Sequence, residues 1–273
     1  MIFELNPSQF KSISHLLDGE RVNLEVKAVV EGYNPGWVFV DNVMEPQAAM
    51  VWSKGIKGFY FLGKTDSESF NNYLNTYIKY IIAPRARKME LSTFEFSGTS
   101  QAWEDKLMEI FSERDLSITK QYVYKRPASM ADGELSVQLD KAYEVHTVNK
   151  DLFERTELDL SLVKESVNDW WGSAQKFSEN GIGYCIVHEN TAVCSCTASS
   201  YDGSEVQSHI VTNESYRKKG LATAAVAEFV KTAEKTDLDL YWDCMEKNEG
   251  SRALAEKMGY VKAYEYKLFE FSI

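Results

Sequence analysis

The sequence is poor in cysteine and proline and has no long apolar run. Its longest apolar stretches fall far short of the roughly 18 to 20 uncharged residues that span a bilayer, which excludes a membrane-spanning helix. The first segment, MIFELNPSQF, has no basic start and no long apolar core, so we expect no secretory signal and a cytoplasmic protein. Four cysteines lie in the second half at spacings of neither a zinc site nor a CxxC redox pair. They predict small, reduced core side chains and no metal.

The composition is that of a globular chain with an acidic charge balance. Hydrophobic residues make up 44% of the sequence and charged residues 26%, which excludes disordered and collagen-like classes. With 41 acidic against 30 basic residues, the net charge of −11 repels nucleic acid and anionic membranes. We therefore expect no nucleic-acid or membrane partner and a site open to a cationic small molecule. A homodimer is left open.

The order of the expected elements repeats once along the chain, at an offset of roughly 145 residues. In the first half, helical periodicity and strand patterns fall at 8–17 (helix), 20–30 (helix), 37–41, 48–52 and 58–62 (strands), 66–82 (helix), 88–96 (strand), 101–111 (helix) and 117–124 (strand). The second half gives strands at 143–148, 183–187, 191–199, 206–212, 238–245 and 261–271, with helices within 150–177 and at 221–235 and 250–258.

A stretch rich in turn formers, RPASMADGELS, separates the two halves. We expect a degenerate module at 1–126, a linker at 127–136 and a second module at 137–273. Two unrelated α/β domains are the alternative, because a shared element order alone does not prove a duplication.

A basic turn opens the alanine-rich helix of the second half. Arg217, Lys218 and Lys219 crowd its start, where each cation opposes the helix dipole by about 0.3 to 1 kcal/mol unless an anion is bound. Gly220 lets a ligand approach the backbone, and small residues keep the first turn slim enough for free N–H groups to face a phosphate. The turn therefore suits a pyrophosphate; a solvated basic turn is the alternative. The first helical residues are Leu221, Ala222 and Thr223.

A second motif lies after the next strand, in the segment NEGSRALAEKMGY. Asn248 is placed to cap a helix, and Gly259 falls where a left-handed residue ends it. Together the two motifs resemble the signature of the GCN5-related N-acetyltransferases (GNAT), over roughly 137–273, and the first half resembles a degenerate copy. Within this family the chain is most similar to the two-module branch that includes zwittermicin acetyltransferase. The residues that carry the resemblance are Arg217, Gly220, Ala222, Asn248, Ser251, Leu254, Gly259 and Tyr260.

The resemblance implies a mixed α/β (α+β) fold of tandem acyl-CoA N-acyltransferase-like modules, each a twisted mixed sheet flanked by helices. Acetyl-CoA would lie where the strand ending near Thr212 splays from the strand at 238–245. Backbone N–H groups of residues 217–223 would hold the pyrophosphate, main-chain groups of Ile210, Val211 and Thr212 the pantetheine arm, and Asn248 and Ser251 would flank the cofactor. The implied activity is direct transfer of the acetyl group to a primary amine of a small molecule. A catalytically silent acyl-CoA-binding module and a transferase with another acyl donor are the alternatives.

The general base is sought on the strand EVQSHIVT, where Gln207 and His209 share one face. His209 has a pKa near 6.5 in water and could take the proton of the amine, directly or through water. A structural histidine is the alternative, and Asp243 and Glu205 are further candidates for the base. Glu205 could instead occupy an exposed turn.

The general acid is not assigned by the sequence. Many relatives place a tyrosine seven residues after the asparagine, where this chain has Ala255. Tyr241, Tyr260 or Tyr264 could replace it, or the thiolate could leave unaided, since a thiol has a pKa near 8.5.

Two further segments bear on the acceptor and on the first half. Trp170 and Trp171, with Asp169 beside them, could wall an amine pocket, although at least one tryptophan is expected in the core. At the turn equivalent to the basic one, the first half has Asp66 and Glu68, which repel a pyrophosphate. We therefore expect the first module to bind no CoA.

Overall fold

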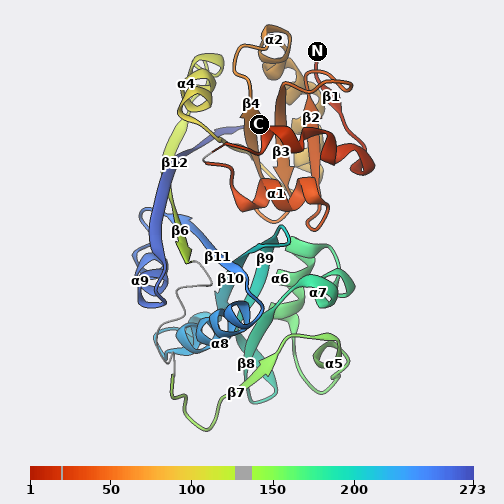
Figure 1. Cartoon of the computed structure of the whole chain (residues 1–273). Helices are drawn as coiled ribbons and strands as arrows, with labels where there is room; N and C mark the ends of the chain where they lie inside the picture. Colours follow the sequence, from red (N-terminus) through yellow and green to blue (C-terminus); the bar gives the residue numbers. More distant parts are fainter. Residues whose placement is uncertain (20, 127–136) are drawn as a thin grey trace. The chain divides into compact units, whose positions relative to one another are not determined.

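The computed structural model describes residues 1–19, 21–126 and 137–273, so the expected linker at 127–136 lies outside the described residues. The chain has a mixed α/β fold and divides into two compact units (Figure 1). The first unit comprises Met1–Tyr122 and Tyr264–Ile273, and the second comprises Val123–Ala263. Among the described residues, no helix has both the length and the apolar character needed to cross a membrane.

The first unit is a mixed sheet with the strand order β1-β2-β3-β4-β5-β12, where β12 is Val261–Ser272, and among its described pairings β4 and β5 run parallel. Phenylalanine and tryptophan side chains from the strands and from α2 and α4 form its core. Its elements are β1 (Phe3–Glu4), the 3-10 helix η1 (Pro7–Leu16), α1 (Leu24–Glu31), β2 (Gly36–Val40), β3 (Ala48–Ser53), β4 (Gly58–Gly63), α2 (Glu68–Tyr77), the π-helical turn η2 (Ile78–Ile82), α3 (Ala83–Lys88), β5 (Thr93–Gly98), α4 (Gln101–Ile110) and β6 (Ser117–Arg126).

The prediction from the sequence is wrong at the junction between α3 and β5. A strand was expected at 88–96, but residues up to Lys88 continue the helical path through η2 and α3, and β5 begins only at Thr93. Pro84 does not end the helix, because it lies in the first turn of α3, where a missing N–H group costs no hydrogen bond.

The second unit has the strand order β6-β11-β10-β9-β8-β7, and β10 and β11 are its parallel pair. One face of the sheet is covered by α8, where the Tyr184 hydroxyl lies 2.7 Å from Thr232 Oγ1. The helices α6 and α7 cover the other face (Figure 1). Its elements are β7 (Glu144–Thr147), α5 (Lys150–Phe153), α6 (Ser161–Trp171), α7 (Ala174–Asn180), β8 (Gly183–His188), β9 (Thr191–Tyr201), β10 (Glu205–Thr212), the 3-10 turn η4 (Glu214–Tyr216), α8 (Leu221–Lys235), β11 (Asp239–Met245), α9 (Glu249–Lys257) and β12 (Val261–Ser272).

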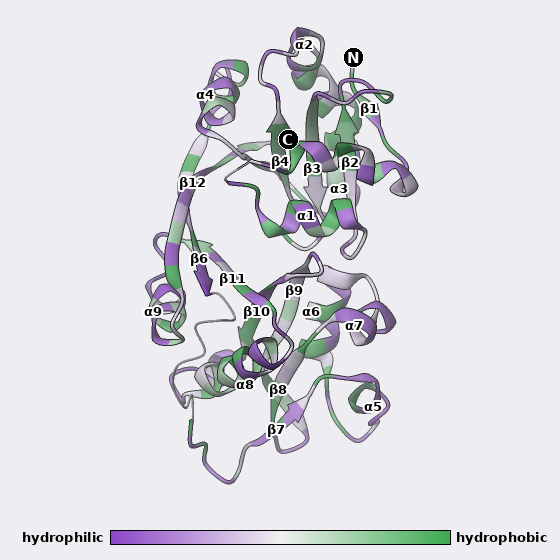
Figure 2. Cartoon of the chain, in the orientation of Figure 1, coloured by the Kyte–Doolittle hydropathy of each residue, from purple (hydrophilic) through white to green (hydrophobic). Residues whose placement is uncertain are grey.

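Apolar residues on β8 and on one side of α8 bury the sheet of this unit. The hydrophobic colour follows β8 in Figure 2, and the side chains of Cys185, Ile186 and Val187 on that strand are buried. The buried side of α8 carries small and apolar residues, including Ala225, Phe229 and Val230. The helix therefore packs closely on the sheet while its first residues remain at the edge of the unit.

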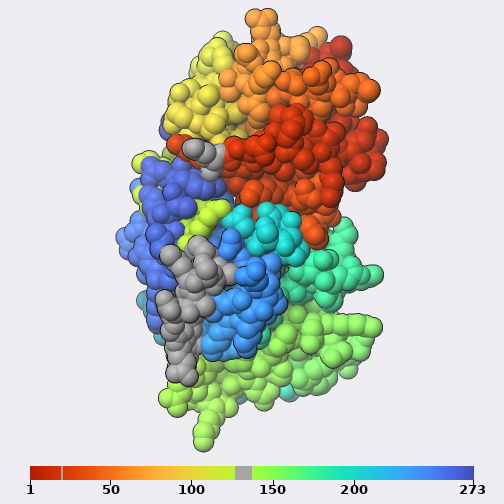
Figure 3. All heavy atoms as spheres, viewed as in Figure 1, coloured from red at the N-terminus to blue at the C-terminus, as the bar shows by residue number. Residues whose placement is uncertain are grey.

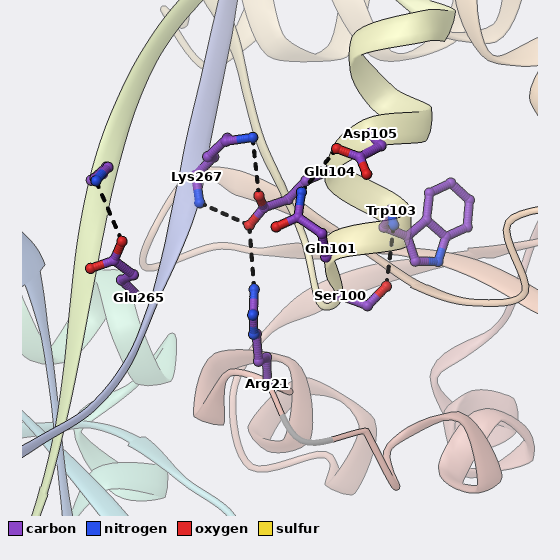
Figure 4. A network of polar contacts seen from close by, with 9 residues as sticks. Arg21, Ser100, Gln101, Trp103, Glu104, Asp105, Glu265 and Lys267 are labelled. Atoms are coloured by element: carbon purple, nitrogen blue, oxygen red, sulfur yellow. Dashed lines mark hydrogen bonds and ion pairs between the residues drawn. The ribbon is translucent and has the colours of Figure 1, made fainter.

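Each compact unit contains part of the last strand of the other half of the sequence: the first unit contains the end of β12, and the second contains the end of β6. In the first unit, Leu268–Ser272 of β12 pairs antiparallel with β5. The buried carboxylate of Glu104 on α4 fixes this strand, since it accepts the backbone N–H of Lys267 at 3.1 Å and lies 3.4 Å from Lys267 Nζ (Figure 4). Arg21 contributes a third contact to the same carboxylate at 3.9 Å.

In the second unit, the end of β6 is held by three acidic side chains. Tyr124 and Lys125 contact Glu256 and Glu205 at 3.3 and 2.6 Å, and the next residue, Arg126, forms a largely buried ion pair with Glu234. The sequence predicted modules at 1–126 and 137–273, each with its own last strand. In the compact units, the end of β6 belongs to the second unit and the end of β12 to the first.

Candidate functional site

The parallel strands β10 and β11 pair only at their beginnings. Their register joins Glu205, Val206 and Gln207 to Asp239, Leu240 and Tyr241, and in the described residues no pair follows Gln207. Beyond this point β10 keeps its hydrogen-bonding partner β9 on the other side as far as Thr212. The β11-facing edge of residues 208–212, including Ile210 and Val211, is therefore left without a strand partner, and these residues are all half-buried.

The loop after β10 has an unusual backbone conformation. Two of its residues, Lys218 and Gly220, lie in the left-handed region with φ of 62° and 79°. A Cβ atom placed on Gly220 would meet no atom within 4 Å, so the space above this residue is open. Arg217, Lys218 and Lys219 are exposed at the start of α8, and the residues of α8 form part of the surface seen in Figure 3.

The same loop presents a row of free donors. Across the described residues, the N–H groups from Lys218 to Thr223 have no hydrogen-bond acceptor, and the first helical N–H bond is that of Ala224 to Gly220 O at 3.0 Å. Leu221 buries its side chain, while Ala222 and Thr223 are half-buried. Open space, free N–H groups and the positive end of the helix dipole coincide here, and such a place binds phosphate groups.

The start of α9 is built as expected from its sequence. Asn248 Oδ1 accepts the backbone N–H of Ser251 at 3.1 Å and so caps the helix, and Gly259 after its end has a φ of 81°. Ser251 Oγ also accepts the indole N–H of Trp242 on β11 at 3.0 Å. Asn248 and Ser251 thus lie at the end of β11, and their side chains already have structural partners.

His209 lies on the half of β10 that has left β11. The ring of Trp170, on α6, lies 5.6 Å from the His209 ring, centroid to centroid. Burial lowers the pKa of His209 below 6.5, and the nearby charge of Asp169 partly offsets this. Burial therefore favours the neutral imidazole, the form that can accept a proton. Trp171 instead packs in the core, where its indole N–H donates to Ala198 O at 2.8 Å.

Gln207 is buried where β10 and β11 part, and its Oε1 atom has no hydrogen-bond partner within the described part of the chain. Because strand side chains alternate, Gln207 and His209 point to the same face of the sheet. Asp243 lies half-buried on β11. Glu205 does not occupy an exposed turn: it is buried at the start of β10 and paired with Lys125 at 2.6 Å.

Neither Tyr241 nor Tyr260 is placed as an evident acid, and the third candidate, Tyr264, lies half-buried on β12 in the first unit. Ala255 is fully buried on α9, and Tyr241 is fully buried on β11. Burial raises the pKa of the Tyr260 hydroxyl far above its ordinary value of 10, so Tyr260 is a core residue. The four cysteines are also buried and reduced, and burial raises the pKa of Cys185 to about 12 and that of Cys194 to about 11.

The corresponding strands of the first unit end soon after their last residue pair. β4 and β5 pair from Phe59 with Phe96 to Phe61 with Gly98, a pair that includes the bond from the Thr99 N–H to Phe61 O at 3.0 Å, and β4 ends two residues later at Gly63. The fully buried Trp103 then donates its indole N–H to Gly63 O at 2.9 Å. Trp103 therefore occupies the place where the second unit is open.

The two acidic residues expected to repel a pyrophosphate, Asp66 and Glu68, are exposed at the start of α2. Their charges were expected to distinguish the first half from the second, whereas the role of Trp103 was missed. A signal for it was present, since Ser100 caps α4 by accepting the N–H of Trp103, which places the indole one turn after β5.

Separated parallel strands, a loop of free N–H groups at a helix start and a second capped helix together fit the class of the acyltransferases. The GNAT acetyltransferase family model matches residues 14–269, and the chain belongs to this family. It is an acyltransferase, and members of the family generally use acetyl-CoA or another acyl-CoA as donor.

Three similar proteins match over almost the whole chain. The uncharacterized N-acetyltransferase YdfB of Bacillus subtilis (strain 168) is 24% identical over 268 residues, which cover 97% of each chain. A crystal structure of a GCN5-related N-acetyltransferase-like protein from Streptococcus suis 89/1591 is 20% identical with a TM-score of 0.69, covering 97% of this chain and 98% of that one. A tandem GNAT protein from the clavulanic acid biosynthesis pathway is 13% identical with a TM-score of 0.61, covering 100% and 98%. These structures confirm the tandem fold.

Proposed function

We propose that the protein transfers the acetyl group of acetyl-CoA to a primary amine of a small molecule, in the second unit. The observation that carries this proposal is the separation of β10 and β11 after Gln207, directly before the loop with free N–H groups. A pantetheine arm is an extended chain with amide groups, and the unpaired edge of Ile210–Thr212 offers it backbone hydrogen bonds. The diphosphate would lie at the start of α8, near Arg217 and Gly220.

The chemistry requires a proton acceptor and a stabilised oxyanion. His209, whose neutral form is favoured by burial, would take a proton from the ammonium group of the acceptor, directly or through water, and the free amine would then attack the thioester carbonyl. As the C–N bond forms, charge develops on the carbonyl oxygen, and a backbone N–H on the open edge of β10 would stabilise it. The C–S bond then breaks, the nitrogen releases its second proton to solvent as the amide forms, and the thiolate takes up a proton in solution or leaves unaided. Gln207 and Asp243 would contact the acceptor or orient it.

The acceptor would enter beside α6. Asp169 is half-buried next to His209 and carries the charge expected to attract an ammonium group. Trp170 is buried against the His209 ring, so it shapes the wall of the site rather than standing free.

The direct test is to mix the purified protein with acetyl-CoA and a panel of primary amines and to measure released thiol together with the acetylated product. We expect saturable turnover with at least one amine. Arg217→Ala should weaken acetyl-CoA binding, whereas Arg155→Ala, which removes an exposed arginine paired with Glu157 in the same unit, should not. Failure of the wild-type protein to bind acetyl-CoA would overturn the assignment of the cleft.

A silent acyl-CoA-binding module is favoured by one observation, the buried Ala255 at the position where many relatives have a tyrosine. It predicts saturable binding of acetyl-CoA without turnover on any amine. Turnover with acyl-CoA donors of other chain lengths but not with acetyl-CoA would instead point to a different donor.

A further inference from the structure

Three aromatic rings gather behind the loop that precedes α8. The hydroxyl of Tyr216 lies within hydrogen-bond distance of His188 Nδ1, at 3.2 Å, and the centroids of the two rings are 5.5 Å apart. Tyr143, before β7, packs on His188, and the centroids of their rings are 5.0 Å apart. All three side chains are half-buried, and they come from three separate segments of the second unit.

The loop needs such support because its backbone is strained. Lys218 is not a glycine, yet it adopts a φ of 62°, a conformation that costs about 1 kcal/mol or more and persists only where the surroundings impose it. Its neighbours on both sides are held. Lys219 places its ammonium group 4.7 Å from the centre of the Tyr216 ring, and Arg217 Nε contacts Thr212 O at 3.4 Å.

Tyr216 is the residue through which these contacts meet. Its N–H donates to Asn213 O at 2.9 Å, its ring lies under Lys219, and its hydroxyl is bonded to His188 at the end of β8. Asn213 is itself anchored to β9, since its N–H donates to Val193 O at 2.9 Å. The contacts connect the strained part of the loop to two strands of the sheet.

We propose that Tyr216 and His188 are positioning residues that hold the loop in the shape that presents its free N–H groups to the diphosphate of an acyl-CoA. This proposal rests on the proposed function. Neither side chain is proposed to touch the reacting atoms. If the hydroxyl bond is lost, the loop samples other conformations, and only part of the population can bind the donor.

The experiment compares Tyr216→Phe, His188→Ala and the double variant with the full-length wild-type protein. Acetyl-CoA affinity is measured by isothermal titration calorimetry, and kcat and KM are measured for both substrates. We expect each single variant to raise the Kd and the KM for acetyl-CoA about three- to tenfold, the range given by one lost hydrogen bond, with kcat and the KM for the amine unchanged. The double variant should be no weaker than the weaker single variant, since both remove the same bond.

A matched control separates positioning from general stability. Tyr184→Phe also removes a hydroxyl bond in this unit, the 2.7 Å contact with Thr232 on α8, but this bond does not involve the loop. The variant should lower the thermal stability comparably and leave the Kd for acetyl-CoA unchanged. Equal Kd values for wild type, Tyr216→Phe and His188→Ala would overturn the proposal, as would an equal loss in Tyr184→Phe. If the wild-type protein binds no acetyl-CoA, the proposed function fails first and this proposal falls with it.

Discussion

The first unit contains a pair of facing carboxylates whose effect on stability depends on pH. Glu95 on β5 is directly opposite Glu270 on β12 in the antiparallel register. Burial, and secondly the charge of Glu270, raise the pKa of Glu95 from 4.5 to about 7. The carboxyl oxygen also lies 3.0 Å from the position that a Cβ atom on Gly58 would occupy, so β4 closes the site on one side.

The sign of the effect comes from proton linkage. Between pH 4.5 and 7 the folded protein holds a proton on Glu95 that the unfolded chain has released, so the stability of the folded state falls as pH rises through this range. A shift of the pKa from 4.5 to about 7 corresponds to about 3 kcal/mol, and partial exposure of the side chain reduces this to about 2 kcal/mol. Glu95→Gln removes the ionisation and should stabilise the protein by that amount at pH 8.

The assay is urea unfolding of wild type and Glu95→Gln at pH 5 and pH 8, with each midpoint converted to a free energy of unfolding. We expect a gain of about 2 kcal/mol at pH 8 and well under 1 kcal/mol at pH 5, where Glu95 is already protonated. Glu270→Gln should give a smaller gain at pH 8, because it removes the repulsion but not the cost of burial. Glu113→Gln, at an exposed position, is the control. A gain of equal size at both pH values would refute the reasoning.

Four further results are expected. Glu104→Ala should lower the free energy of unfolding by about 3 kcal/mol, because it leaves Lys267 and Arg21 without their buried partner, whereas the exposed neighbour substitution Asp105→Ala should leave the urea midpoint unchanged. Gly220→Ala should cost about 1 kcal/mol through its left-handed backbone alone and should weaken acetyl-CoA binding in a titration; an unaltered affinity would contradict the open approach above this residue. In the pH profile of kcat/KM, the midpoint of the acidic limb should lie below pH 6.5. Asp169→Asn should move this midpoint to lower pH, because the charge of Asp169 raises the pKa of His209; a midpoint that does not move would show that His209 is not the base. Titration should find one acetyl-CoA per chain, and a second equivalent would contradict the closure of the first unit by Trp103.

Much of the fold could be predicted because its elements carry strong local signals. The helix expected at 221–235 is α8 to the residue, since Gly220 marks its start and an apolar face with alanine spacing continues to its end. The capped start of α9 and the left-handed Gly259 were likewise visible in the sequence, because each depends on one residue type at one position.

The remaining features depend on contacts between distant residues, which local patterns do not contain. The sequences of β10 and β11 give no sign that pairing stops after Gln207, and the sequence of β12 does not say that it pairs antiparallel with β5 of the first unit. The neighbours of His209 were missed for the same reason: Trp170 reaches it only through the packing of α6 on the sheet. Tyr216 and His188 are linked by no spacing that a sequence motif could hold.

The two units show how one strand order can be open or closed. Both contain a meander and then a parallel pair with a helical crossover, and each parallel pair joins three residue pairs, but β10 continues for five residues beyond its last pair whereas β4 continues for only two. The difference lies in the helix that comes after the second parallel strand. In the first unit a tryptophan on α4 donates to Gly63 O and fills the gap, whereas in the second unit Trp242 belongs to β11 and bonds to Ser251 on α9. An indole in the first turn of the helix after the second parallel strand therefore closes the first unit. The second unit has no indole at that position of α9, which leaves it able to admit an extended ligand.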